Sequence, residues 1–187
     1  MKGVVLLSDG IDSPVAAMLM KKQGLELIFL NFKNDNNPRT IEKVKKIANH
    51  IDKNALLITK DHIKTQEKIK NSCNVRYQCV LCKRAMYKGA EEVAIEHGAK
   101  FIVTGENLGQ VASQTLDNMY VLDSSVNLTV LRPLLGFDKN EIVKRGKELG
   151  TYELSLIKAP SCPYVPDSPL TKSRLHKVLI EEKKMNR

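Results

Sequence analysis

The chain has 187 residues, of which 42% are hydrophobic, and its 30 Lys and Arg against 21 Asp and Glu give a formal net charge of +9. This length is typical of one domain that buries about 70% of its unfolded surface without disulfide or metal staples. No apolar run approaches the roughly 20 residues that span a bilayer, and no signal peptide precedes the first apolar run. We therefore expect a cytoplasmic protein without membrane contact. The positive charge favours a polyanionic partner such as RNA, although lysines that only solvate helix faces give the same balance.

The chain begins with an apolar run, a polar turn over residues 8–14 and a helical pattern. A strand, a tight turn and a helix in this order point several backbone N–H groups at one spot, which suits a phosphate. Ser8 and Ser13 add hydroxyl donors, and Gly10 permits close approach of the backbone. An ordinary capped turn between a strand and a helix explains the same spacing.

Strand and helix patterns alternate along the rest of the chain. Residues 25–32 are almost wholly apolar, which is typical of a strand buried on both faces of a parallel sheet. The expected strands are residues 3–7, 25–32, 55–59, 100–105 and 128–135, and the expected helices are residues 15–20, 39–51, 61–70, 83–98, 138–150 and 171–183. This order predicts a doubly wound α/β fold: a mainly parallel five-stranded sheet with helices on both faces and ligands at the carboxyl ends of the strands.

The chain contains four cysteines: Cys73, Cys79, Cys82 and Cys162. Structural disulfides are rare in a reducing compartment, so thiol chemistry or metal ligation has to be considered. The two-residue gap between Cys79 and Cys82 lets both sulfurs face one centre, and the basic residues Lys83 and Arg84 lie near enough to lower thiol pKa values or to bind phosphate. Two buried thiols at the start of a helix are the plainer alternative.

The first loop, Ser-Asp-Gly-Ile-Asp-Ser over residues 8–13, resembles the Ser-Gly-Gly-x-Asp-Ser signature of the PP-loop ATP pyrophosphatases, which cleave ATP between its α and β phosphates. With the residues that follow, it is similar to the 4-thiouridine synthetase branch, the tRNA sulfurtransferases. A run from Thr104 to Thr115 matches eleven of twelve positions of a motif of that branch, and residues 79–86 resemble its archaeal-type members. Asp9 departs from the signature, because a carboxylate repels a triphosphate unless it points away or binds Mg²⁺.

The resemblance implies an enzyme that uses ATP and Mg²⁺ to adenylate a uridine oxygen in tRNA and then replaces that oxygen by sulfur. The residues it assigns to the nucleotide are Ser8, Gly10, Ile11, Asp12, Ser13, Asn31, Phe32, Gly105, Gln110 and Gln114. The alternative to a nucleotide-binding role for Asn31 and Phe32 is that they simply form the end of a strand. The residues assigned to catalysis are Asp12, which helps to place Mg²⁺, and Cys79, Cys82 and Cys162.

For RNA contacts we expect Lys83, Arg84 and Arg132. In the alternative interpretation, Lys83 and Arg84 contact only the neighbouring Cys82 thiol. Arg132 meets either a phosphate or a carboxylate at the end of a strand.

Cys79, Cys82 and Cys162 match the three cysteines of the archaeal-type members, in which the third one handles sulfur. Three thiolates suit an iron–sulfur cluster with one iron left open for sulfide, while zinc and metal-free persulfide chemistry are the alternatives. The family's N-terminal RNA-binding domains and a rhodanese domain find no match in this sequence. We therefore expect RNA to be captured by the basic surface, by a homodimer, which the resemblance favours, or by a separate RNA-binding protein. The sulfur donor stays open.

The resemblance covers residues 2–171, which predicts a PP-loop ATP pyrophosphatase domain over residues 1–170 and a helical tail over residues 171–187. An arm with four prolines, residues 151–169, is expected to bring Cys162 across the cleft.

Two other functions stay open. An enzyme that thiolates or amidates a small molecule predicts ATP use without RNA affinity. An accessory protein that binds a nucleotide or metal without turnover predicts that Asp9 blocks phosphate binding, so that Asp9→Gly raises ATP affinity.

Overall fold

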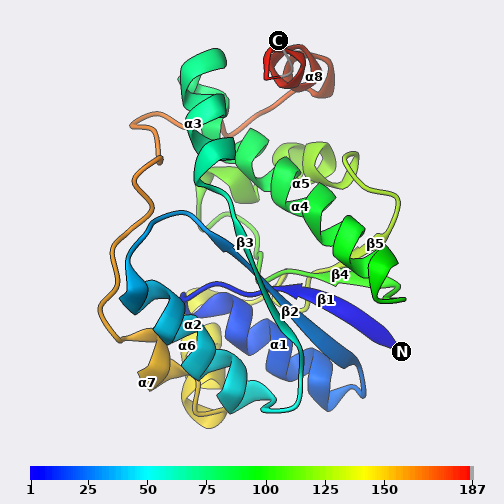
Figure 1. Cartoon of the computed structure of the whole chain (residues 1–187), viewed down its shortest axis with the longest axis vertical. Coiled ribbons are helices and arrows are strands. Elements are labelled where there is room, and N and C mark those ends of the chain that lie inside the picture. The colour runs from blue at the N-terminus through cyan, green and yellow to red at the C-terminus, as the bar shows by residue number, and fades with distance from the viewer. Residues whose placement is uncertain (186–187) are drawn as a thin grey trace.

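The computed structural model describes residues 1–185, in which five strands form one sheet (Figure 1). The strands are β1 (Lys2–Leu6), β2 (Glu26–Lys33), β3 (Leu57–Asp61), β4 (Phe101–Val103) and β5 (Thr129–Leu131). Their order is β3-β2-β1-β4-β5, and all four neighbouring pairs are parallel. The predicted doubly wound α/β fold is confirmed.

Helices cover both faces of the sheet, as Figure 1 shows. One face carries α1 (Asp12–Lys22), α2 (Pro38–Ile51), α6 (Lys139–Glu148) and α7 (Tyr152–Ser155). The other carries α3 (Ile63–Ser72), α4 (Gln78–Glu96), α5 (Leu116–Asp123) and α8 (Leu175–Lys184), with short 3₁₀ turns η1 (Val75–Tyr77) and η2 (Ala112–Gln114). Alternation along β1 divides the core, because Val5 packs with Ile47 of α2 and Val4 packs with Val93 of α4. Among residues 1–185, no helix is long and apolar enough to cross a membrane.

Two elements differ from their expected bounds in ways that affect the site. Helix α4 begins at Gln78, five residues before the predicted start, because the apolar side chains of Val80 and Leu81 are buried in the core as part of the helix. Both Cys79 and Cys82 therefore lie in its first turns. Strand β5 is three residues long rather than eight and ends before Pro133, which has no N–H to donate to a neighbouring strand.

The last helix belongs to the same packed layer as α4. Val178 of α8 is fully buried, and Glu182 pairs with Arg84 of α4 at 3.1 Å. The division of the chain at residue 170 stays a prediction, and residues 186 and 187 of the predicted tail lie outside the described part of the chain.

The loops after β1 and β4 meet at the switch point of the sheet, because β2 and β4 flank β1 on opposite sides. In doubly wound sheets this crevice is where ligands bind. Gly105 shows how closely the two loops approach, since a Cβ there would lie 2.5 Å from the backbone nitrogen of Ser13. The contact explains why a glycine stands at this position.

We expect Gly105→Ala to lower the free energy of unfolding by about 1–3 kcal/mol and to weaken ATP binding, because a methyl group forces the two loops apart. Chemical denaturation and ATP titration measure the two effects. Gly136→Ala is the matched control, since a Cβ at that position would meet no heavy atom within 4 Å. Wild-type stability and affinity in Gly105→Ala would disprove the close contact.

Candidate active site

Two serine hydroxyls close the first loop. The Ser8 backbone N–H donates to Ser13 Oγ at 2.8 Å, and the Oγ atoms of Ser8 and Ser13 lie 2.9 Å apart. The Gly10 N–H in turn lies 3.3 Å from Ser8 Oγ. The hydroxyls that are expected to donate to a phosphate thus also shape the first loop.

A cavity of about 210 Å³, which we call the first cavity, opens between this loop and the loop after β4. The predicted nucleotide-binding residues that line it are Ser8, Gly10, Asp12, Ser13, Gly105 and Gln114. Lining residues without a predicted nucleotide role are Leu6, Lys83, Met86, Tyr87, Thr104 and Glu106. The signature and the Thr104–Thr115 run therefore converge on one space, although about a hundred residues separate them in the sequence.

Four residues expected at the nucleotide are not part of this lining. Asn31 is buried and its Nδ2 donates to the Leu7 carbonyl at 2.9 Å, which ties β2 to the end of β1. The Phe32 ring meets the edge of His62 at a centroid distance of 5.1 Å. Ile11 packs on the apolar cluster of α1 and α6, and Gln110 holds a buried Nε2 without a hydrogen-bond partner. Asn31 and Phe32 thus have the contacts of a strand exit, and their role at the nucleotide stays a prediction.

Lys139 is a functional candidate that the sequence interpretation missed. Its Nζ lies 2.6 Å from Asp12 Oδ1, so the first residue of α6 meets the first residue of α1 at the edge of the first cavity. The ammonium group of Lys139 therefore lies beside Asp12 and the first loop. The signal was present in the sequence, since a lysine directly follows the helix cap Asp138 after the last strand.

Asp9, the departure from the family signature, is paired with a cation. Its Oδ2 lies 3.4 Å from Nζ of Lys43 on α2, whose side chain is only 5% exposed. Asp9 is not among the residues that line the first cavity. The carboxylate is therefore directed toward Lys43, and the expectation that it obstructs a phosphate is not supported.

We expect Asp9→Gly to leave ATP affinity within about threefold of wild type and to lower the free energy of unfolding by about 1–3 kcal/mol, because a buried ammonium loses its partner. ATP titration and denaturation measure these effects. Adding Lys43→Met to Asp9→Gly removes the unpaired charge and should restore most of the stability. A large gain in ATP affinity in the single variant would show that Asp9 does obstruct the cavity.

Glu106 is the centre of a buried ionic network beneath the first cavity. Lys83 Nζ donates to it at 2.8 Å, Arg132 Nε at 2.9 Å and the Tyr87 hydroxyl at 2.5 Å. Burial opposes ionisation of Glu106, but the adjacent Lys83 ammonium, with Tyr87 and Arg132, outweighs it and lowers the pKa to about 2. Burial and the Glu106 charge raise the pKa of Tyr87, so that hydroxyl stays a donor. The network holds Lys83 at the cavity wall.

The predicted RNA contacts are largely engaged inside the protein. Arg84 is 2% exposed, pairs with Glu182, donates to Ser124 Oγ at 2.9 Å and also donates to the Val121 carbonyl. The prediction that Arg84 contacts RNA is corrected, because its guanidinium fixes α8 to α4 instead. Arg132 pairs with Glu106 and Asp123, in agreement with the alternative of a strand-end carboxylate.

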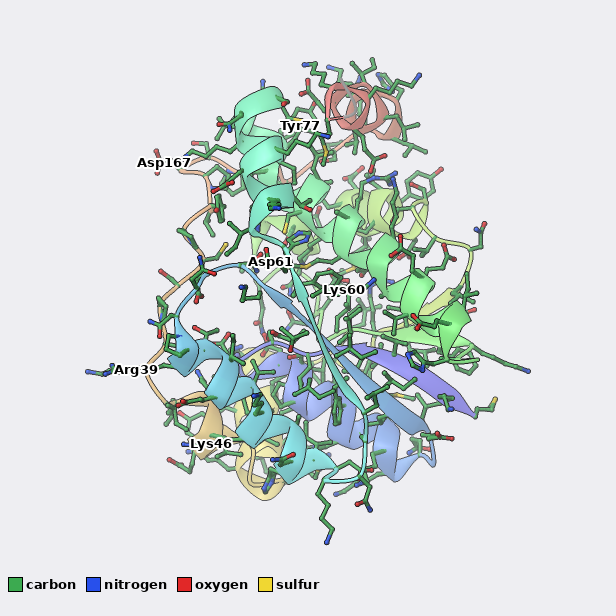
Figure 2. All side chains as sticks on the ribbon, viewed as in Figure 1. Arg39, Lys46, Lys60, Asp61, Tyr77 and Asp167 are labelled. Atoms are coloured by element: carbon green, nitrogen blue, oxygen red, sulfur yellow. The ribbon has the colours of Figure 1, made fainter. Side chains whose placement is uncertain are left out.

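Other cations remain at the surface. Arg39 and Lys46 on α2 are exposed, and Figure 2 shows the Arg39 side chain projecting from the fold. A basic surface for a polyanion therefore does not depend on Arg84.

A second cavity of about 300 Å³ contains the three predicted catalytic cysteines in its lining. Cys79 and Cys82 come from α4, and Cys162 comes from the arm after α7 and is exposed. Lys83 and Met86 line both cavities, so the two spaces adjoin at these side chains. Cys73 lies elsewhere and donates its S–H to the Glu181 carbonyl at 3.3 Å.

The helix cysteines are thiols at neutral pH. Burial raises the pKa of Cys82 to about 12, and burial also raises the pKa of Cys79 although the Lys83 charge opposes it. Cys82 Sγ accepts a hydrogen bond from Gln66 Nε2 at 3.1 Å and lies 3.5 Å from His62 Nε2. Burial lowers the pKa of His62 to about 4, so its ring is neutral. In the described residues, no three His, Cys, Asp or Glu side chains are grouped to hold a metal ion.

The arm that carries Cys162 is fixed at its far end. Leu170 N donates to the Arg76 carbonyl at 3.1 Å, and Asn118 Nδ2 donates to the Leu170 carbonyl at 2.8 Å. The hydroxyl of Thr115 donates to the Thr171 carbonyl at 2.6 Å. These contacts fix the chain directly after the predicted arm, and Cys162, Tyr164, Val165 and Pro169 of the arm line the second cavity.

Comparison with known proteins identifies the family. The family model described as "Thiamine biosynthesis protein (ThiI)" matches residues 1–186. This chain belongs to the ThiI family. ThiI relatives named "Probable tRNA sulfurtransferase" include one from Thermococcus kodakarensis, 45% identical over 90% of this chain and 46% of the relative. Another, from Methanocaldococcus jannaschii, is 42% identical over 97% of this chain and 49% of the relative. The chain spans about half the length of these ThiI relatives.

Solved structures agree with the ThiI assignment. "Crystal structure of a 4-thiouridine synthetase - RNA complex with bound ATP" superposes with a TM-score of 0.94 at 36% identity, over 99% of this chain and 50% of that one. The structure of NMN synthetase from Francisella tularensis has a TM-score of 0.63 at 19% identity, over 98% of this chain and 82% of that one, and shows a shared fold alone. The PP-loop fold of this ThiI chain is thus confirmed.

Proposed function

We propose that this chain carries the catalytic site of an ATP-dependent tRNA sulfurtransferase that converts a uridine carbonyl to a thiocarbonyl. The observation that carries the proposal is the junction of the two cavities at Lys83 and Met86. One cavity is built from the PP-loop signature and the other contains all three candidate sulfur-handling cysteines. The named relatives and the RNA complex with bound ATP support the same reaction class. With tRNA as substrate, the place of action is the cytoplasm.

In the first step, ATP lies in the first cavity with its phosphates at the first loop. The loop N–H groups and the start of α1 favour an anion. Asp12 lines the cavity and presents oxygen ligands of the kind that Mg²⁺ prefers, so Asp12 would hold that ion, whose charge would neutralise the phosphates. Lys139, which reaches Asp12 across the cavity edge, would then be free to bind a phosphate oxygen.

In the second step, the uridine carbonyl oxygen forms a bond to the α phosphorus. The bond from that phosphorus to the α–β bridging oxygen breaks, and pyrophosphate leaves with the electron pair while the ring N–H proton passes to water. The adenylated oxygen is now a good leaving group. Lys83 lies at the junction and stabilises the negative charge that develops there.

In the third step, the terminal sulfur of a persulfide on Cys162 bonds to the base carbon, and AMP leaves with the C–O electron pair. Cys79 then attacks the S–S bond, which leaves the sulfur on the base and forms a disulfide between Cys79 and Cys162. An external thiol reduces this disulfide for the next turnover. The exposed position of Cys162 suits loading by a separate sulfur donor.

An iron–sulfur cluster is the alternative sulfur carrier. Thiolates are the ligands that such clusters take, and Cys79, Cys82 and Cys162 would hold it on the wall of the second cavity, where it would supply sulfide. Closure of the arm onto α4 would have to bring the three sulfurs together. Iron and acid-labile sulfide analysis after anaerobic purification distinguishes the two carriers.

The proposed function is tested with an unmodified tRNA transcript, ATP labelled at the α phosphate, and a persulfide donor. We expect AMP to form only with tRNA present and thiolated uridine to appear in equal amount. Ser13→Ala, which removes the hydroxyl that closes the first loop, is expected to lower AMP formation at least tenfold. AMP formation with a small-molecule acceptor but not with tRNA would favour the small-molecule enzyme instead.

Capture of tRNA is proposed to use the exposed basic residues together with a second copy of the chain or a separate RNA-binding protein. The formal charge of +9 supports an electrostatic contribution, and the affinity should fall steeply with salt.

A further inference from the structure

The second cavity has the size and chemistry of a site for a small, partly polar ring. Its apolar lining residues are Met86, Val111, Ala112, Val165 and Pro169, with Tyr164 beside them. Its polar lining residues, apart from the cysteines and Lys83, are Asn34, Gln66, Gln78 and Ser113. Apolar walls with a few fixed hydrogen-bonding groups are typical of pockets that hold an unstacked base.

Gln78, which belongs to the lining of this cavity, carries an unused hydrogen-bond acceptor. The residue is 2% exposed, and its Nε2 donates to Gln66 Oε1 at 2.8 Å and to the Gln66 carbonyl at 3.2 Å. Both partners are acceptors, so the amide cannot be turned round. Its Oε1 is buried and has no partner among the described residues. A buried acceptor without a donor is unfavourable, which points to a ligand with an N–H group.

Lys83 presents the complementary donor. It is the cation that lines both cavities, and Glu106 holds its ammonium at 2.8 Å. An ammonium donates hydrogen bonds and has no acceptor, so it binds a ring carbonyl and disfavours a ring amino group.

We propose that the second cavity binds an unstacked uracil ring of the RNA, with its 4-carbonyl oxygen toward Lys83 and its ring N–H toward Gln78 Oε1. This inference rests on the proposed function and adds to it the acceptor subsite and the groups that select uracil. Cytosine has an amino group in place of the carbonyl and an unprotonated ring nitrogen in place of the N–H, so both contacts reject it. The carbon of this 4-carbonyl group is then the atom that receives sulfur from the cysteines in the same cavity wall.

Two variants test the subsite in the full chain with tRNA and ATP. Val165→Trp fills the cavity from the exposed arm, where Val165 is 61% exposed, so the fold is retained. Gln78→Leu removes the unpaired acceptor. Both are expected to lower tRNA-dependent AMP formation at least tenfold while ATP affinity stays within about twofold of wild type. Ile180→Trp on α8 is the matched control, since Ile180 is 57% exposed and does not line the cavity.

Alkylation of Cys79 tests base selectivity without turnover. Short oligouridylate is expected to slow iodoacetamide labelling of Cys79 at least fivefold, and oligocytidylate to have little effect. Equal protection by the two oligonucleotides, or none, would overturn the uracil assignment, as would wild-type AMP formation in Val165→Trp. If wild-type chain forms AMP and thiolated tRNA but these variants behave as wild type, the subsite is wrong and the proposed function stands. If wild-type chain forms no AMP with tRNA, the proposed function itself fails.

Discussion

Cys162→Ser is expected to lower the formation of thiolated uridine at least a hundredfold while tRNA-dependent pyrophosphate release in a single turnover stays within about threefold of wild type. The serine hydroxyl occupies the same place on the arm but cannot carry a persulfide. ATP cleavage needs only the first cavity, whose lining does not include Cys162. Adenylated tRNA should therefore form and slowly hydrolyse to AMP. Quantitative nucleoside analysis and release of pyrophosphate separate the two steps.

Cys73→Ser is the matched control, because Cys73 contacts the Glu181 carbonyl of α8 and does not line either the first or the second cavity. It should leave both steps unchanged. Cys79→Ser should resemble Cys162→Ser in thiolation but should still release AMP in the first turnover, because Cys79 acts after AMP has left. If Cys162→Ser still makes thiolated uridine at a wild-type rate, sulfur does not travel through Cys162 and the proposed third step is wrong.

Glu106→Gln is expected to lower the free energy of unfolding at neutral pH by about 3 kcal/mol, because Lys83 and Arg132 lose their shared carboxylate in a buried site. The lowered pKa of Glu106 leads to the same magnitude. One pKa unit corresponds to about 1.4 kcal/mol, and the pKa moves from an ordinary 4.5 to about 2. Loss of the Glu106 carboxylate should also displace Lys83 and lower tRNA-dependent AMP formation at least tenfold.

The pH dependence has a defined sign. Because the pKa of Glu106 is lower in the folded state, its ionised form stabilises the fold above about pH 4.5, and this contribution is lost as the pH falls through the folded value near 2. Denaturation curves between pH 7 and pH 2 should therefore show a smaller loss of stability in Glu106→Gln than in wild type. Glu148→Gln, which removes an exposed pair with Arg145, should change stability by less than about 1 kcal/mol. Identical acid profiles for wild type and Glu106→Gln would show that the network does not depend on the carboxylate charge.

The fold and the first cavity could be predicted because both follow from patterns of neighbouring residues in the sequence. Apolar runs, helical stripes and turn residues specify alternating strands and helices, and parallel connections bring the loops after β1 and β4 to one edge. The bounds of short elements depend on contacts between distant parts of the chain. The length of β5 depends on where pairing with β4 stops, and the start of α4 depends on a core that buries Val80 and Leu81. Neither is visible in a short window of sequence.

The amino-acid sequence by itself determined the parallel α/β fold, the first loop that is proposed to bind phosphate and the identity of the cysteines that handle sulfur in the proposed reaction. Only the tertiary structure decided which charged side chains form ion pairs inside the protein. Arg84 is paired with a residue 98 positions away, Asp9 with Lys43, and Lys83 with Glu106. An ion pair depends on the distance between two side chains and on their removal from water, and both are set by packing between elements distant in the chain. The sequence therefore shows which residues are charged, whereas the fold decides which of these charged side chains can contact a ligand.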